Sequence, residues 1–335
     1  MFRGGVLAAV AQVLVGSSVA VLGALREYPL YTGQGLRYGA SMLMLAAVLA
    51  AMPRRFEPPA RERLRPSDGV RLLGMAVTGM VGFNLFVVAA ERRADPALVG
   101  VIVGGAPVVL ALATPLLARR MPSGRLVLAG VVVTAGVALA QGVGGGRLSG
   151  MLLAAGGLAG EVSFALISVG LVRRIGAMRV SIYACGTAVL LCVLGTVLME
   201  DPRAPTGPEL AALVWMAAGA TALAYLCWFG SLALLGAERF GLFTGLVPFS
   251  AVGVTYLIGT GSPGWGHLAG AVLVGTGLLV GLTGATTTEA PSPAAGNAYR
   301  PPRPVPVAAP VPVAVPVTAA SAAAPSAQER EARPR

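Results

Sequence analysis

Residues 97–120, ALVGVIVGGAPVVLALATPLLARR, and residues 240–261, FGLFTGLVPFSAVGVTYLIGTG, read as copies of one another around Pro107 and Pro248. The likeness extends further along the chain. A Leu-Ala-Gly triplet follows each proline, from Leu128 after the first and from Leu268 after the second, at spacings that agree to within one position. These stretches indicate an internal duplication, which guides the interpretation of the rest of the sequence.

The composition is that of a membrane protein. Of the 335 residues, 56% are hydrophobic and only 12% are charged, which leaves too little polar surface for a soluble protein of this length. A helix needs about twenty apolar residues to cross the hydrocarbon core. The chain has ten such segments, at residues 5–24, 34–52, 69–90, 96–118, 125–142, 148–171, 180–199, 209–235, 240–260 and 265–284. The sequence therefore predicts an all-α polytopic membrane protein with ten transmembrane helices.

The ten segments form two sets of five, and each proline-bearing stretch is the fourth of its set. An odd number of crossings makes the second set enter the membrane in the opposite sense. Inverted repeats of this kind build secondary transporters, with a binding site near the midplane. We predict a first repeat at 1–145, a second at 146–285 and a Pro/Ala-rich tail at 286–335 that is disordered.

The arginines predict the orientation. All 25 basic residues are arginine, and if the amino terminus is cytoplasmic, 19 of them fall on the cytoplasmic side and six on the other. This bias follows the positive-inside rule and predicts that both termini, including the tail, are cytoplasmic. The net charge of +11 does not indicate nucleic-acid binding, because no basic cluster is interleaved with aromatic residues on a soluble domain.

The order of segments resembles the drug/metabolite transporter superfamily, in particular the EamA-type permeases with two five-helix repeats. The matching pieces are Gly16-Ser17-Ser18, Arg37-Tyr38, Ala106-Pro107, Val247-Pro248 and the two Leu-Ala-Gly triplets. The chain departs from that pattern near Arg119 and Thr260, where a glutamate is common, and at Val15, where tryptophan is usual.

The resemblance implies a permease of the bacterial inner membrane that works by alternating access. It would export small metabolites such as amino acids, or toxic organic compounds. Its partners would then be the lipid bilayer, a small-molecule substrate and, in a coupled mechanism, protons. The sequence leaves open the substrate, the coupling ion and whether the protein forms a homodimer.

Glu161 is the first candidate for a functional charge. It lies deep inside the segment 148–171, far from either end, so it cannot easily reach the membrane interface. A carboxyl group at that depth commonly faces an aqueous cavity or a partner, which suits proton coupling or cation binding. The alternative is a neutral glutamic acid hydrogen-bonded across a helix interface. If Val15 and Phe164 are matched between the repeats, Gln12 is the counterpart of Glu161.

Further polar groups at membrane depth could orient a substrate, although cross-helix hydrogen bonds explain each equally well. These candidates are Ser17, Asn84, Tyr183 and Tyr225, with Trp228 for an apolar part of the cavity. Asn84 and Tyr225 lie at the same spacing before the proline of their repeat, which makes them counterparts. The resemblance adds Arg37 and Tyr38.

Pro107 and Pro248 are candidate hinges. Each proline removes a backbone hydrogen bond and frees the carbonyl one helical turn earlier, on Val103 or Thr244. A kink beside a midplane cavity suits a moving helix. Proline in membrane helices also serves packing alone, so this alternative remains open.

Two other functions compete with transport. An intramembrane enzyme is disfavoured, because the single histidine, His267, sits at the edge of a predicted span and the three cysteines have no metal-ligand spacing. We therefore expect no enzymatic activity, metal or cofactor. A membrane scaffold with a proline-rich recruiting tail is the other alternative. A transporter needs polar groups that converge between the repeats, whereas a scaffold does not.

Overall fold

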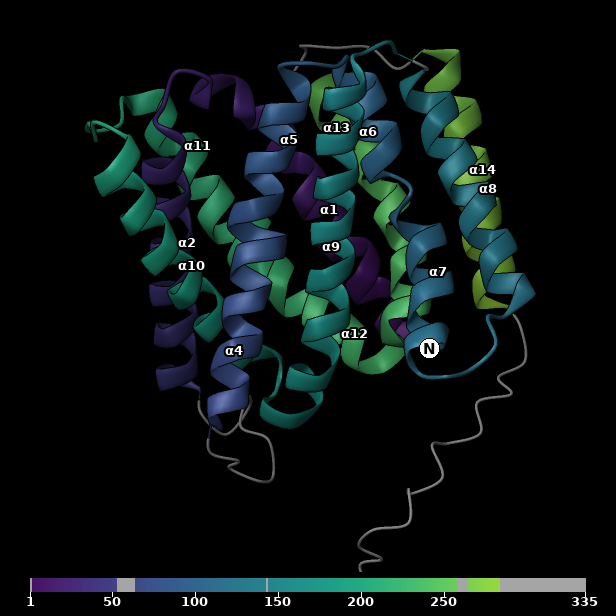
Figure 1. The fold of residues 1–335 in the computed structure, drawn as a ribbon, viewed down its shortest axis with the longest axis horizontal. Helices are drawn as coiled ribbons and strands as arrows, with labels where there is room; N and C mark the ends of the chain where they lie inside the picture. Colours follow the sequence, from purple (N-terminus) through teal and green to yellow (C-terminus); the bar gives the residue numbers. More distant parts are fainter. Residues whose placement is uncertain (1, 53–63, 143, 258–263, 284–335) are drawn as a thin grey trace, which may run out of the picture. The chain divides into compact units, whose positions relative to one another are not determined.

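The computed structural model describes residues 2–52, 64–142, 144–257 and 264–283 (Figure 1). Within these ranges the protein is helical and has no β-strand, apart from one isolated bridge between Ala94 and Gly146. Residues 1–285 form one compact unit. The predicted disordered tail lies outside the described residues.

The described residues form α-helices joined by short 3₁₀ and π segments. The α-helices are α1 (Phe2–Val21), α2 (Leu30–Ala51), α4 (Pro66–Met75), α5 (Phe83–Glu91), α6 (Pro96–Val103), α7 (Ala106–Leu117), α8 (Gly124–Gln141), α9 (Leu148–Ile175), α10 (Ala177–Met199), α11 (Gly207–Ala217), α12 (Ala224–Gly241), α13 (Val247–Leu257) and α14 (Trp265–Leu282). The 3₁₀ segments are η1 (Leu22–Leu25) and η4 (Leu242–Leu246), and the π segments are η2 (Ala76–Gly82) and η3 (Ala218–Leu223).

Among the residues that the structure describes, seven helical segments are long and apolar enough to cross a membrane, judged by length and composition. They are Pro66–Glu91, Pro96–Leu117, Gly124–Gln141, Leu148–Ile175, Ala177–Met199, Gly207–Val254 and Trp265–Leu282. The segment Gly207–Val254 has 48 residues, and it is interrupted at Gly236, whose φ of 75° lies outside helical geometry. Glycine adopts this conformation without steric cost, so the chain can reverse there.

The helices that start the third and eighth predicted spans are capped in the same way. Asp68 of α4 accepts a hydrogen bond from the Arg65 backbone N–H at 2.7 Å, and Glu209 of α11 accepts one from the Thr206 N–H at 2.7 Å. Both acidic residues lie at the same spacing before the proline of their repeat. Asp68 forms an ion pair with Arg174, and Glu209 with Arg203. The sequence placed this helix start at Ser67 or Asp68, close to its position at Pro66.

The same spans depart from α-helical geometry at matching places. η2 and η3 end at the same spacing before Pro107 and Pro248, respectively, and their starts agree to within one position. Both prolines are the second residue of a helix, α7 or α13, that follows an irregular turn. π-Helical segments interrupt the regular backbone hydrogen bonds of an α-helix and are frequent at functional sites.

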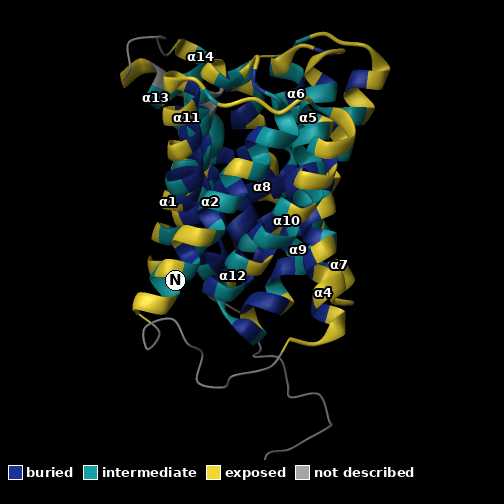
Figure 2. Cartoon of the chain, turned by 90° about the vertical axis from the view of Figure 1, so that its left-hand side faces the viewer, coloured by how far each residue is buried: buried dark blue, intermediate teal, exposed yellow. Residues whose placement is uncertain are grey.

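The packing alternates between the two predicted halves of the chain. α1 packs against α12 and α13, while α9 packs against α4, η2, α5 and α6. α2 pairs with α10, and α8 pairs with α14. Figure 2 shows buried residues in the interior of this unit and exposed residues outside. The outer face is apolar, as at Leu190 and Leu198 of α10, which fits contact with lipid.

Candidate functional site

A cavity of about 670 Å³ lies between the predicted halves of the chain. Its walls come from α1, α2, η2, α5, α6 and α8 of the first half and from α9, α11, η3, α12, η4, α13 and α14 of the second, the last through His267. Its volume is within the range of about 300 to 1,000 Å³ that is usual for small-molecule sites. The candidate site is therefore built from helices that are distant in the sequence.

Most of the side chains singled out from the sequence line this cavity. The lining candidates are Gln12, Arg37, Tyr38, Asn84, Glu161, Tyr225 and Trp228, together with Pro248. Ser17, Tyr183 and Pro107 are not among the lining residues. Ser17 is buried and accepts a hydrogen bond from the Trp215 indole N–H at 3.2 Å, Tyr183 is exposed on α10, and Pro107 is buried in α7.

A chain of hydrogen bonds fixes Arg37 on one wall. Its Nε–H donates to Thr221 Oγ1 at 2.5 Å, and its Nη1–H donates to Gln34 Oε1 at 3.4 Å. Gln34 Nε2–H donates in turn to Asn84 Oδ1 at 3.4 Å, and Asn84 Nδ2–H donates to the Met80 carbonyl at 2.5 Å. The chain therefore joins α2 to both π-helical spans.

Arg37 brings a positive charge to the cavity. Its guanidinium carbon lies 5.3 Å from the centre of the Tyr38 ring, a favourable cation–π distance. Within the described residues, no carboxylate forms an ion pair with Arg37. The guanidinium is thus a candidate group for an anionic part of a ligand.

Glu161 brings a carboxyl group to the cavity from α9. It is partly buried, and in the described part of the chain no hydrogen bond or ion pair reaches its side chain. The interface hydrogen bond that the sequence left open for Glu161 is therefore absent among these residues. Since a carboxyl group at membrane depth needs a proton or a cation, this side chain suits either role.

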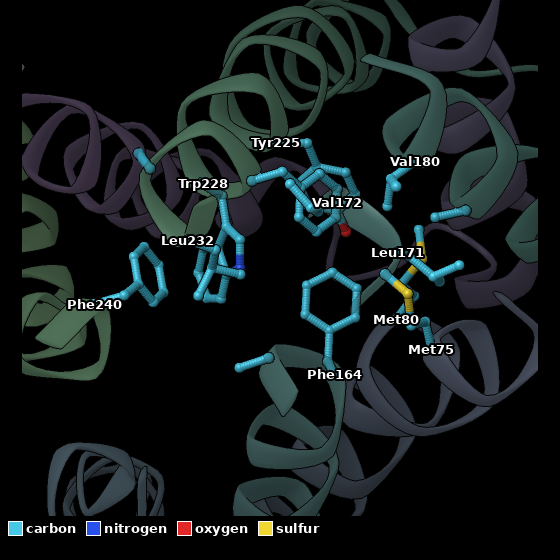
Figure 3. Close-up of a cluster of buried hydrophobic side chains, with 14 of the residues drawn as sticks. Met75, Met80, Phe164, Leu171, Val172, Val180, Tyr225, Trp228, Leu232 and Phe240 are labelled. Atoms are coloured by element: carbon cyan, nitrogen blue, oxygen red, sulfur yellow. The ribbon is translucent and has the colours of Figure 1, made fainter. Parts of the chain in front are cut away.

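Aromatic side chains form an apolar wall between α9 and α12 (Figure 3). The Phe164 ring centre lies 5.9 Å from that of Tyr225, 5.9 Å from that of Trp228 and 5.7 Å from that of Phe229. Trp228 also packs against Phe240, with the ring centres 4.5 Å apart. The cavity thus combines an apolar wall with a few polar groups, a usual arrangement in small-molecule sites.

The two ends of the cavity differ. One end reaches Glu91 and Pro96, which are exposed where α5 meets α6. Toward the other end, α7 packs against α12, and Arg120 Nη2 lies 3.5 Å from Glu238 Oε1. Among the described residues, α6 and α13 have no packing of comparable extent. The cavity is therefore closed on the side of the α7–α12 contact.

Sequence reasoning missed Gln34 as part of the site. This residue does not line the cavity, but it connects Arg37 to Asn84. The available signal was spacing, because Gln34 and Arg37 are one helical turn apart and share one face of α2. The contact with Asn84 depends on tertiary packing and has no signature in the sequence.

Comparisons with known proteins agree with this architecture. The chain is similar to the Uncharacterized transporter YetK of Bacillus subtilis (strain 168), with 25% identity over 257 residues, 73% of this chain and 76% of the relative. It also resembles a solved crystal structure with a TM-score of 0.71 and 18% identity, covering 83% of this chain and 96% of the other. That second likeness concerns the fold alone.

The model of the EamA-like transporter family matches the chain twice, at residues 3–141 and 148–283. The two matches together cover well over half of the sequence, and their boundary falls between α8 and α9. The protein is therefore a multi-pass membrane transporter of small substrates and belongs to the EamA-like transporter family.

Proposed function

We propose that the protein exports small metabolites, either amino acids and related compounds or toxic organic compounds, across the bacterial inner membrane. The mechanism is alternating access, with Glu161 as the proton-coupling group. The observation that carries the proposal is the cavity of about 670 Å³, which both predicted halves line and which is closed toward one end.

The proposal includes ten crossings in two inverted repeats. The seven segments that satisfy the length criterion include one of 48 residues that reverses at Gly236 and accounts for two crossings. The apolar helices α1 and α2, of 20 and 22 residues, supply two more. The matched helix caps and π segments support equivalence of the halves.

A contact pattern places Gln12 at the position of Val162, one residue from its predicted counterpart Glu161. Trp215 and Gly74 are equivalent positions, because they lie at the same spacing before the proline of their repeat. Trp215 bonds to Ser17 of α1, and Gly74 faces Ile167 of α9. Aligning Ser17 with Ile167 places Gln12 next to the position of Glu161, one step away along the helix.

The unequal ends of the cavity support alternating access. The contacts of α7 and the residues after it with Glu238 and Gly241 lie beyond the reversal at Gly236, so they join the fourth and ninth predicted spans. In an inverted repeat the same two spans meet again at the other end, where Gly100 is the counterpart of Gly241 and Ala251 that of Leu110. Both of these residues line the cavity, so this end is open. Exchanging the closed and open ends would expose the same cavity to the opposite side.

The cavity is proposed to face away from the cytoplasm in this state. The closed end of the cavity lies on the same side of the protein as the amino terminus, because a Cβ atom on Gly4 would touch Leu234 and Leu235 of α12. The arginine bias makes that end cytoplasmic. An exporter in this state would release substrate outward and take up a proton at Glu161 before it reopens inward.

Transport assays test the proposal in two steps. A metabolite-wide comparison of cells with and without the protein should show a compound that is depleted inside and enriched outside when the protein is present. Purified protein in proteoliposomes should then move this compound against its gradient when a proton gradient is imposed. Failure to change the distribution of any compound, with the protein abundant in the membrane, would contradict the proposed export.

A further inference from the structure

Two arginines at one end of the contact between α4 and α9 carry unneutralised charges. Arg71 lies near the start of the span Pro66–Glu91, and Arg173 lies near the end of the span Leu148–Ile175. Both are exposed, and within the described residues neither side chain forms a hydrogen bond or an ion pair. Residues 64–75 and 170–180 contain five arginines and a single acidic residue, Asp68, which is paired with Arg174. This end of the two helices therefore has an excess of positive charge.

Gly170 of α9 lies between the two arginines. A Cβ atom on Gly170 would lie 3.6 Å from Arg71 Nη1 and would meet no other helix of the described chain within 4 Å, so the Arg71 guanidinium lies over this glycine. Gly170 is itself exposed. Arg173 follows it by three residues and so lies on the same face of α9, one helical turn nearer the end of the span. Two helices thus present an arginine each beside a position without a side chain.

An apolar surface continues from the arginines toward the middle of the span. Val70, Leu73 and Val77 share one face of α4 and are 72%, 47% and 48% exposed, respectively. In a membrane protein, exposed apolar side chains of a span contact the acyl chains of lipids. The surface therefore combines a cationic part near the end of the span with an apolar part farther in. This is the polarity that complements a phospholipid with an anionic headgroup.

The fold itself has no need of these two arginines. The equivalent helix cap of the second half forms around Glu209, and there the spacings used above place Ala212 at the position of Arg71 and Gly23 at that of Arg173. The charge bias across the membrane does not depend on them either, because the sequence between α2 and α4 already carries five arginines. Arg71 and Arg173 are therefore available for a ligand.

We propose that Arg71 and Arg173 bind the phosphate group of an anionic phospholipid whose acyl chains lie along the exposed apolar face of α4. A guanidinium group can donate two parallel hydrogen bonds to phosphate oxygens. Its flexible stem lets it reach the headgroup from within the span. Since α4 belongs to the first predicted half and α9 to the second, the bound lipid bridges the two halves. The inference is independent of the proposed substrate and direction of transport.

Native mass spectrometry of the purified full-length protein in detergent tests the site. The lipid probes are phosphatidylglycerol, which is anionic, and phosphatidylcholine with the same acyl chains, which is zwitterionic. Inorganic phosphate is added as a competitor that has the phosphate chemistry without acyl chains. The variants are Arg71→Gln, Arg173→Gln and the double substitution. Arg3→Gln is the matched control, because it removes the same charge from an exposed arginine of α1. Gly170→Leu keeps every charge and fills the surface beside Arg71.

The unsubstituted protein is expected to bind phosphatidylglycerol about tenfold or more tightly than phosphatidylcholine. Arg71→Gln and Arg173→Gln should each weaken phosphatidylglycerol binding by about fivefold, and the double substitution should weaken it by about 30-fold. Arg3→Gln should leave it unchanged. Gly170→Leu should also weaken it, although the net charge stays the same. Gel filtration and circular dichroism establish that each variant is folded, and the variants alter two different helices, so a folding defect in one leaves the others as the test.

Equal affinity of the unsubstituted protein for the two lipids would overturn the assignment. An effect of the arginine variants no larger than that of Arg3→Gln would do the same, because it would reduce the binding to general attraction between charges. Undiminished phosphatidylglycerol binding by folded Gly170→Leu protein would also contradict the site. Displacement of phosphatidylglycerol by millimolar inorganic phosphate would identify the ligand as free phosphate and overturn its assignment as a lipid.

Discussion

The closed end of the cavity offers a direct perturbation at Gly241. A Cβ atom on this glycine would lie 2.8 Å from Leu110 Cδ1 and 3.0 Å from Leu110 Cβ. Carbon atoms pack at about 3.5 to 4.0 Å, and Leu110 Cβ moves only with α7, so α7 and α12 would have to separate by about 0.5 Å. Gly241→Val adds two further methyl groups at the same point.

The magnitude follows from the cost of overpacking, which is about 1 to 3 kcal/mol. This cost applies only while α7 and α12 are in contact, so it favours the state in which they separate. The population of that state should rise by about 5- to 150-fold. Gly253→Val of α13 is the control, because a Cβ atom at Gly253 meets nothing within 4 Å.

Cysteine accessibility measures this shift. Thr244 lines the cavity, so Thr244→Cys reports the accessibility of the cavity in protein from which the three native cysteines have been removed. Membrane vesicles of both orientations are treated with an impermeant thiol reagent. Gly241→Val should raise the labelling rate from the amino-terminal side relative to the opposite side, and Gly253→Val should not. An unchanged ratio in folded Gly241→Val protein, or an equal shift in both variants, would refute the reasoning.

Three further predictions concern coupling, topology and hinges. Glu161→Gln should abolish proton-driven uphill transport in proteoliposomes while the protein remains folded and inserted, and unchanged uphill transport would assign Glu161 to structure. In intact cells, a single cysteine at Ser67 should be shielded from an impermeant thiol reagent, and one at Gly145 should be labelled by it. Labelling at Ser67 would reverse the orientation. Pro107→Ala and Pro248→Ala should shift cavity accessibility toward opposite sides by about tenfold, and identical shifts or none would reduce both prolines to packing features.

The sequence predicted the helical membrane fold well because hydrophobicity alone determines it. Without water in the bilayer core, a long apolar segment must satisfy its backbone as helix. The depth of a polar residue also follows from its distance to the ends of its segment. Depth was sufficient to select Asn84 and Glu161, and the match between the repeats added Gln12; all three line the cavity.

The side of the helix on which a residue lies was harder to predict than its depth in the membrane. In a soluble protein an apolar stripe marks the interior, but both faces of a membrane helix are apolar. Tyr183 therefore had the correct depth and lies on the exposed face of α10. Ser17 is buried, but its hydroxyl is engaged by Trp215, which no pattern near Ser17 could indicate.

The proposed alternating access requires the closed end of the cavity to separate, so the contacts at that end decide what the change costs. The Arg120–Glu238 pair spans 3.5 Å, and the Arg120 side chain is 64% exposed. An exposed ion pair contributes only about 0 to 1 kcal/mol. α7 also packs against α12 near Gly241. The proposed second state requires this packing to separate, and the exposed ion pair adds little to the cost.

The matched breaks in the two halves suggest where that motion is accommodated. η2 and η3 lie at equivalent spacings before Pro107 and Pro248, so both halves of the site have the same irregular backbone. Only the contacts between helices differ, with α7 against α12 on one side and α6 apart from α13 on the other. Under the proposed alternating access, the difference between the sides is a difference of state, and a ligand that binds the two states unequally would shift the protein between them.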